Sequence, residues 1–271
     1  MKALTLKTTR AGFKLLSGIA PGMSVRAAAR LFSTPRSRPV SPQEKAILDR
    51  GEALRLSGLA ATAWGVGPTV LLVHGWERHR ASLSAFVIPL VERGLRVVAF
   101  DAPAHNDSPG RTANPIQFTE AILGVANTLG PLRGVVSHSM GGGATVMALH
   151  EGLEAQRVVL LAPASDWEYQ MRFFATYVGL TSAAADRFVA YIQAQAGRSL
   201  SEMTPRDLCA EVAQPVLLFH DHDDARVPYS DSVDLQANLP HAELVPLEGL
   251  GHSKLLRASS VIERAVDFLS R

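Results

Sequence analysis

Two serines flank a histidine in the stretch Val-Val-Ser-His-Ser-Met-Gly-Gly-Gly at residues 135–143. A serine hydroxyl acts as a nucleophile when a base lies within hydrogen-bond reach and an acid orients that base. Later in the chain come three aspartates within residues 221–224 and a histidine, His252, in a Gly-Leu-Gly-His loop. These residue types indicate nucleophilic acyl transfer, with Ser137 and Ser139 both candidates for the nucleophile.

The elements that would position these residues are short apolar segments with the length and composition of buried β-strands. They span residues 69–75, 96–101, 134–137, 157–163, 215–221 and 243–247. Amphipathic segments between them predict helices at residues 82–93, 115–129, 140–150 and 258–269. This alternation predicts an α/β fold with a mostly parallel sheet and helices on both faces. Residues 53–56 and 59–64 could add an antiparallel edge.

Ligands of an open parallel sheet bind beyond the carboxyl ends of its strands. Polar residues stand at or after that end of five predicted strands: His74, Asp101, Ser139, Asp224 and His252. We therefore expect a serine, a carboxylate and a histidine at one edge of the sheet.

From about Ala53 to its end, the chain resembles the α/β-hydrolase superfamily through several motifs in register. Ser137-His138-Ser139-Met140-Gly141 matches the superfamily's Gly-x-Ser-x-Gly turn, whose strained nucleophile needs small residues two positions away on both sides. Ser139 meets this condition, whereas the residue two positions before Ser137 is the branched Val135. The resemblance implies an α/β-hydrolase fold with Ser139 as the nucleophile and Ser137 in place of the usual glycine.

The resemblance also assigns the acid and the base. Superfamily members commonly carry Asp-x-x-Val-Pro after the strand that follows the cap, and residues 224–228 match this motif. Asp224 is therefore the implied acid, and Asp223 is the alternative. His252 matches the superfamily's late-loop histidine, which acts as the general base.

The oxyanion hole of the superfamily uses two backbone N–H groups, which match those of Trp76 and Met140. One motif departs from the pattern Asp-x-Pro-Gly-His-Gly-x-Ser, because Ala104 and Asn106 replace its two glycines. We expect a changed backbone there. The charged run at residues 77–80 leads to the hypothesis that this loop selects the acyl group.

Residues 164–214 interrupt the alternation of strands and helices, with helical patterns at residues 166–178 and 182–196. An apolar helical insertion at this point suits a cap over a pocket. The predicted organisation is a basic, helical arm at 1–43, a core at 44–163 and 215–271, and the cap at 164–214. Candidates for substrate contact are Trp76, His138, Trp167, Phe173 and Phe174.

A metal site is the alternative reading of the residues around the acid. His220-x-His222-x-Asp224 resembles the opening of the metal-binding motif of metallo-β-lactamase-like hydrolases. The next residue is Ala225 where that motif has histidine. We therefore expect neither a metal nor an organic cofactor. The single cysteine, Cys209, excludes an internal disulfide and is predicted to be a small structural residue.

Residues 1–43 contain eight of the 27 basic residues and none of the 25 acidic ones. This arm is predicted to pack as helices against the main domain, with weak association with an anionic membrane surface as an alternative. A nucleic-acid partner is not expected. Pro21-Gly22 interrupts the apolar run before it could span a membrane, and no cleavage site follows. A cytoplasmic protein is expected, although the acid-free start also resembles an organelle transit peptide.

Taken together, these features predict a carboxylesterase-like serine hydrolase that cleaves an ester or related acyl substrate through an acyl-enzyme. The same framework also supports thioesterase, C–C hydrolase, acyltransferase and perhydrolase chemistry. A non-catalytic ligand-binding protein with this fold is a further alternative. The oligomeric state is not predicted.

Overall fold

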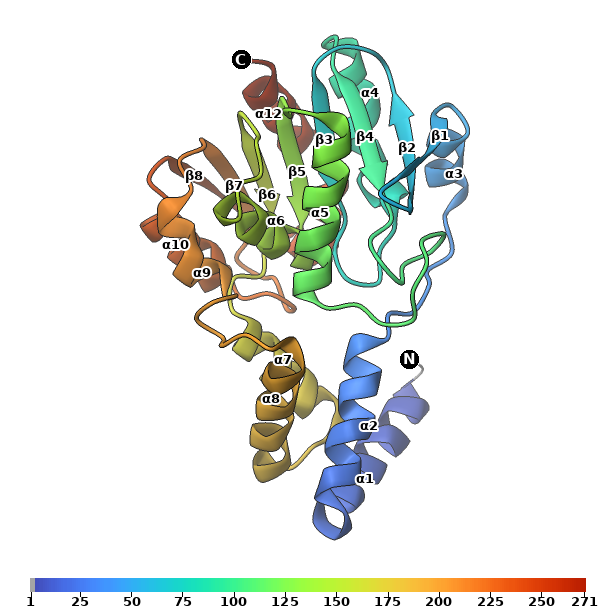
Figure 1. Cartoon of the computed structure of the whole chain (residues 1–271), viewed down its shortest axis with the longest axis vertical. Coiled ribbons are helices and arrows are strands. Elements are labelled where there is room, and N and C mark those ends of the chain that lie inside the picture. Colours follow the sequence, from blue (N-terminus) through green and yellow to red (C-terminus); the bar gives the residue numbers. More distant parts are fainter. Residues whose placement is uncertain (1–2) are drawn as a thin grey trace.

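The computed structural model describes residues 3–271, whose centre is one eight-stranded sheet (Figure 1). Its strands are β1 (Glu52–Leu56), β2 (Leu59–Trp64), β3 (Thr69–Val73), β4 (Arg96–Phe100), β5 (Gly134–His138), β6 (Val158–Leu161), β7 (Val216–Asp221) and β8 (Ala242–Leu247). Their order is β1-β2-β4-β3-β5-β6-β7-β8. Strands β3 to β8 are parallel, and β1 and β2 form an antiparallel edge. The predicted α/β fold and its edge are confirmed.

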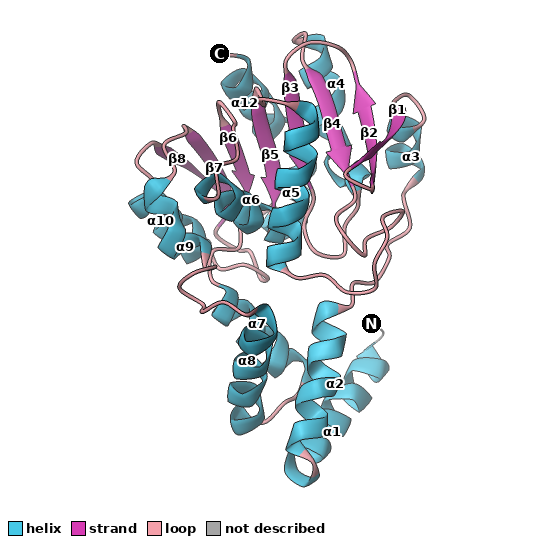
Figure 2. Ribbon diagram, in the orientation of Figure 1, coloured by secondary structure: helices cyan, strands magenta, loops and turns pink. Residues whose placement is uncertain are grey.

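Both faces of the sheet are buried because successive side chains point to opposite sides. In β3, Leu71 and Val73 join one apolar core while Val70 and Leu72 join the other. The first face is covered by α5 (Pro115–Leu129), α6 (Met140–His150) and α10 (Tyr229–Asn238), and α9 (Pro205–Leu208) contacts α6 and α10. The second is covered by α3 (Pro42–Leu48), α4 (Val87–Glu92) and α12 (Ser259–Ser270) (Figure 2).

Helices α5 and α6 begin and end at the predicted residues, and α12 is shifted by one. The continuous helix predicted at 82–93 is wrong. A 3₁₀ helix, η1 (Arg80–Phe86), precedes α4, and Leu83 within it has the non-helical angles φ −103° and ψ 19°. Pro89 explains the break, because its ring would crowd the carbonyl of residue 85 in a continuous helix but is tolerated in the first turn of α4.

A third apolar core joins the N-terminal arm to the insertion. Helices α1 (Ala3–Ile19) and α2 (Pro21–Ser33) form a hairpin that packs on α7 (Trp167–Val178) and α8 (Ser182–Ala196). Phe32 of α2 lies between Phe174 and Phe188, with ring centroids 5.0 and 5.5 Å away. The arm thus packs on the insertion. The carboxyl ends of the parallel strands point toward this helical layer (Figure 2).

Three short elements complete the described residues: η2 (Cys209–Glu211), α11 (Gly251–Lys254) and η3 (Leu255–Arg257). Cys209 is buried and unpaired, as predicted. Within residues 3–271, no helix combines the length and the apolar character needed to cross a bilayer.

Candidate active site

Ser139 occupies a sharp turn between the end of β5 and the start of α6. Its angles, φ 54° and ψ −122°, lie in a region that residues other than glycine rarely adopt. A Cβ added to Gly141 would lie 2.3 Å from the carbonyl oxygen of His74. One added to Gly75 would lie 2.9 Å from the Cβ of Ser139. Glycine at these two positions lets α6 and the loop after β3 approach the nucleophile closely.

The carboxyl ends of β5, β7 and β8 bring the three predicted residues together. The Ser139 Oγ lies 3.0 Å from the His252 Nε2, and the His252 Nδ1 lies 2.6 Å from the Asp224 Oδ2. Because a carboxylate only accepts hydrogen bonds, Nδ1 carries the proton and Nε2 accepts from the serine. The Asp224 side chain is fully buried, whereas that of His252 is 12% exposed. The imidazole can therefore take a proton from Ser139.

Asp224 stays ionised in spite of its burial. Its Oδ1 accepts from the amides of Arg226, at 2.8 Å, and Val227, at 3.1 Å. Its Oδ2, shared with His252, lies 3.4 Å from the Nε2 of His220. Burial raises the pKa of Asp224, but hydrogen bonds from His220, His252 and the Arg226 amide outweigh it and hold the pKa far below its usual value. A permanent negative charge thus faces the imidazole.

The two neighbouring aspartates do not contact His252. Asp221 accepts from the amides of Asp223, at 2.8 Å, and Leu250, at 2.6 Å, which ties the loop carrying Asp224 to the loop carrying His252. The side chain of Asp223 is exposed. Of the alternatives in the sequence, Asp224 alone is placed to orient the histidine.

His220 and His222 make other contacts. His220 places Nδ1 2.7 Å from the Ser232 hydroxyl and Nε2 3.1 Å from the Val227 carbonyl oxygen. The ring of His222 packs on that of Tyr229, with centroids 4.0 Å apart. In the described part of the chain, no three His, Cys, Asp or Glu side chains converge as metal ligands would. His220 therefore acts as a support for Asp224.

His138, expected to contact the substrate, lies against the back of His252. It is 2% exposed, its ring centroid is 4.7 Å from that of His252, and its Nε2 lies 2.9 Å from the His252 carbonyl oxygen. Since a carbonyl only accepts, Nε2 is the donor. Burial and the neighbouring His252 lower the pKa of His138 well below its usual value. It is a neutral residue that positions His252.

Two backbone amides are available beside the nucleophile. Neither the N–H of Met140, the first residue of α6, nor that of Trp76 has a hydrogen-bond acceptor among residues 3–271. His74 supports the loop that carries Trp76. Its Nδ1 donates to the Gly75 carbonyl at 2.7 Å, its Nε2 accepts from the Ala102 amide at 3.0 Å, and burial lowers its pKa. The two amides fit the predicted oxyanion hole.

Two expectations concern the loops around this site. Ala104 and Asn106, which replace glycines, have φ values of 62° and 43°. The loop thus holds both residues in the left-handed region that favours glycine, and the expected change of its backbone relative to the superfamily stays a prediction. In the charged run, Arg80 forms an ion pair with the buried Asp101 and so stabilises the fold. Arg78 instead donates to the Ser253 hydroxyl beside His252, at 2.6 Å.

Comparison with known proteins identifies the family. Residues 70–265 match the model of the alpha/beta hydrolase family. The chain belongs to this family. A pimeloyl-[acyl-carrier protein] methyl ester esterase from Nitrosomonas europaea is 27% identical over 236 residues, covering 71% of this chain and 91% of that protein.

Solved structures agree on the fold. An esterase from Pyrococcus furiosus superposes with a TM-score of 0.67 at 17% identity, covering 88% of this chain and 97% of its own. A meta-cleavage product hydrolase from Pseudomonas fluorescens superposes with a TM-score of 0.59 at 19% identity, covering 82% and 98%. These superpositions support the alpha/beta hydrolase fold. At such low sequence identity they do not identify the reaction, which has to be argued from the site itself.

The other pocket candidates of this alpha/beta hydrolase make contacts outside the relay. Trp167 is buried, donates from its indole to the Met203 carbonyl at 2.7 Å and packs beside α6. Phe174 belongs to the third core, and Phe173 is 41% exposed on α7. Trp76 packs edge-on against His105. Among residues 3–271, these side chains form no hydrogen bond or ring contact with Ser139, His252 or Asp224, so their role in the pocket stays a prediction.

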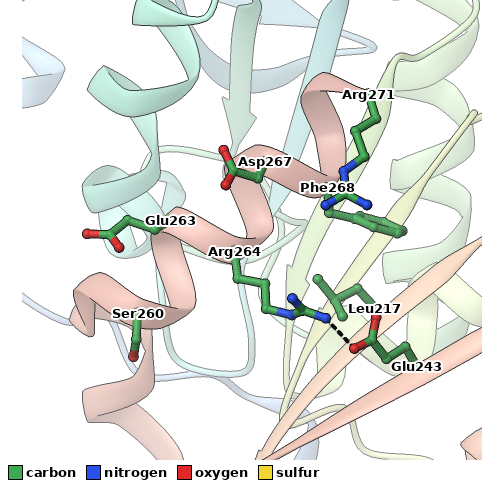
Figure 3. A pocket seen from close by; sticks show the side chains of 8 residues that line it. All are labelled: Leu217, Glu243, Ser260, Glu263, Arg264, Asp267, Phe268 and Arg271. Carbon is green, nitrogen blue, oxygen red and sulfur yellow. Dashed lines mark hydrogen bonds and ion pairs between the residues drawn. The ribbon is translucent and has the colours of Figure 1, made fainter.

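A hollow of about 290 Å³ lies between α12 and the strands β7 and β8 (Figure 3). Its lining residues Leu217 and Glu243 stand near the amino ends of these strands, at the edge opposite to Ser139. Arg264 there forms an ion pair with Glu243. This hollow is unconnected with the proposed chemistry.

Sequence reasoning missed the supporting roles of His138 and His220. Both are buried histidines at strand ends. His138 contacts His252 from a distant segment, whereas His220 lies beside Asp224 of its own segment. The position of His220, four residues before Asp224 at the end of a strand, was a usable signal, although we considered it only as part of the alternative metal motif.

Proposed function

We propose that this alpha/beta hydrolase is a serine esterase that acts on a carboxylic ester. The observation that carries the proposal is the hydrogen-bonded relay of Ser139, His252 and Asp224, with an ionised acid at its buried end. This order of nucleophile, base and orienting acid is what acyl transfer needs.

The reaction follows from the geometry. The Ser139 Oγ forms a bond to the ester carbonyl carbon while its proton passes to the Nε2 of His252. Asp224 stabilises the resulting imidazolium, and the amides of Met140 and Trp76 stabilise the oxyanion. The C–O bond then breaks, and the leaving alcohol takes the proton from Nε2. Water, deprotonated by the same nitrogen, attacks the acyl-enzyme. The bond between the Ser139 Oγ and the acyl carbon then breaks, Oγ takes the proton back from Nε2, and the acid is released.

An ester is favoured over the other acyl substrates because the curated relative is a methyl ester esterase and several similar structures are esterases. Thioester, C–C and acyl-transfer chemistry use the same relay and are the alternatives. We also propose that residues 164–214 cap the site, since α7 and α8 lie on the side to which the strand ends point.

A panel of p-nitrophenyl esters of increasing acyl length, with matched thioesters, tests this proposal against Ser139→Ala. We expect ester turnover in the wild type that falls by roughly 10³-fold or more in the variant. Faster turnover of thioesters would reassign the substrate class. A correctly folded wild type that hydrolyses none of these substrates would favour a ligand-binding protein.

Arg78 supports a finer proposal on specificity. Its guanidinium is partly buried next to His252, and among the described residues it forms no ion pair with a carboxylate. Burial and the nearby Arg38 and Arg226 lower its pKa. We propose that it favours esters whose acyl group bears a negative charge. Arg78→Met should reduce kcat/KM for such esters several-fold while leaving neutral esters unchanged, and equal changes for both would contradict this role.

A further inference from the structure

The hairpin formed by α1 and α2 carries positive charge that has no counterpart within the chain. Its cationic residues are Lys7, Arg10, Lys14, Arg26 and Arg30, all with exposed side chains. None of them forms an ion pair with another part of residues 3–271. Arg172, on the neighbouring α7, differs because it is paired with Glu168 and Asp186. The hairpin is therefore an uncompensated basic surface.

The turn of the same hairpin exposes large apolar side chains. Leu15 and Ile19 at the end of α1 are 67% and 73% exposed, and Met23 at the start of α2 is 58% exposed. Leu15 and Ile19 also border an open groove of about 340 Å³ on the hairpin. Lys14 and Arg26 flank this apolar group in the sequence. A group of exposed apolar side chains flanked by charge is typical of a docking site.

The other side of the hairpin packs against the rest of the chain. Val25, Ala28 and Ala29 are buried in the third core with α8, so the hairpin is held firmly with its apolar turn outward. This turn lies at the opposite end of the molecule from α12 and the C-terminus (Figure 1). No described residue covers it, and it can meet a flat surface without interference from the sheet.

We propose that the α1–α2 hairpin docks on an anionic lipid surface. Leu15, Ile19 and Met23 would enter the boundary between head groups and acyl chains, and the flanking cations would contact the lipid phosphates. The charges argue against a second copy of the chain as the occupant, because a symmetric dimer would bring two basic hairpins together. Nucleic acid would leave the apolar turn without a partner.

Docking through this turn would place α7 and α8 on the membrane side of the active site. The proposed esterase could then receive substrates that partition into lipid, a consequence that rests on the proposed function. The docking itself does not, and it is tested by binding alone.

The test is co-sedimentation of the full chain with vesicles of phosphatidylcholine alone and with vesicles that contain about equal parts of phosphatidylglycerol. We expect binding to the anionic vesicles that weakens several-fold as ionic strength rises. Lys14→Gln with Arg26→Gln should weaken it by roughly tenfold or more. Leu15→Ser with Ile19→Ser should have an effect of the same order.

Matched controls distinguish binding through this surface from non-specific binding through other exposed side chains. Val66→Ser removes an apolar side chain that is 83% exposed on the sheet domain, and Arg50→Gln with Arg111→Gln removes two exposed cations there. Both controls should bind like the wild type. Thermal unfolding checks that every variant is folded. The salt dependence of binding is measured on the wild type and therefore does not depend on any variant being folded.

Equal sedimentation with neutral and anionic vesicles would overturn the proposal, as would hairpin variants that bind like the wild type. A wild-type dimer in light scattering that becomes monomeric in Leu15→Ser with Ile19→Ser, without vesicle binding, would assign the surface to a second copy instead. Loss of esterase activity would leave the vesicle result unaffected, so the two proposals can fail separately.

Discussion

The turn around Ser139 and the hairpin of α1 and α2 differ in whether the chain itself provides partners for their charged groups. At the turn, the buried carboxylate of Asp224 is surrounded by hydrogen-bond donors that the chain itself provides. At the hairpin, cations lack partners among residues 3–271 and Leu15 and Ile19 face solvent. The folded chain therefore compensates the charge of Asp224 by itself, whereas we propose that the hairpin finds its partner in a surface outside the chain.

The largest effect should come from Asp224→Asn. The amides of Arg226 and Val227 would hold the Asn oxygen, so its NH₂ group would face His252 and force the imidazole into the wrong tautomer. We expect kcat to fall about 10⁴-fold with little change in structure. Asp223→Asn is the matched control, because that side chain is exposed, and ester kinetics should match the wild type. Equal losses in both variants would contradict the assignment of the acid.

Gly141→Ala should show how tightly the turn is packed. The added Cβ would meet the backbone oxygen of His74 at 2.3 Å, so the free energy of unfolding should fall by about 3 kcal/mol or more. Gly12→Ala, inside α1, meets no atom within 4 Å and should instead stabilise the protein by about 0.5–1 kcal/mol. Denaturant unfolding measures both changes. A tolerated Gly141→Ala would show that the turn is looser than described.

Asp231 lies where the sheet domain meets the insertion, since its carboxylate accepts from the Ser165 amide at 2.7 Å just before α7. Burial raises its pKa from 3.8 to about 6. Between these values the folded state holds a proton that the unfolded state releases, so stability falls as pH rises from about 4 to 6.

Asp231→Asn removes this titration while keeping an acceptor for Ser165. Relative to the wild type, the variant should gain about 3 kcal/mol of unfolding free energy between pH 4 and pH 7. Denaturant midpoints across this range provide the measurement. A difference between the two proteins that does not vary with pH would contradict the raised pKa.

Ser137→Ala should give the smallest effect and tests an exception at the turn. The Ser137 hydroxyl is buried and has no hydrogen-bond partner in the described structure. Removing it should raise the unfolding free energy by about 1 kcal/mol and leave ester kinetics nearly unchanged. A destabilised variant would mean that the hydroxyl has a partner, such as an ordered water molecule.

Much of the site could be predicted because its geometry depends on local sequence. The small residues around Ser139 and the strand ends before Asp224 and His252 place all three at one edge of a parallel sheet. The contact of His138 with His252 could not be predicted, since it joins segments that only the complete fold brings together, whereas the spacing of His220 and Asp224 is visible in the sequence. The unpaired hydroxyl of Ser137 is likewise a property of three-dimensional packing.

The fold, too, has features that the sequence predicts and features that it does not. Buried strands have a clear apolar pattern, and Pro89 could have predicted the break before α4. The packing of the arm had no such signal. The apolar side chains of α2 are consistent with any apolar partner, and only the tertiary structure shows that this partner is α8.

Labelling with a fluorophosphonate, followed by mass spectrometry of the peptides, tests the central claim most directly. The account predicts a single adduct on Ser139 in the wild type, its retention in Ser137→Ala and its loss in Ser139→Ala. A folded wild type that takes up no label, or a label that persists in Ser139→Ala, would contradict the claim that Ser139 is the nucleophile.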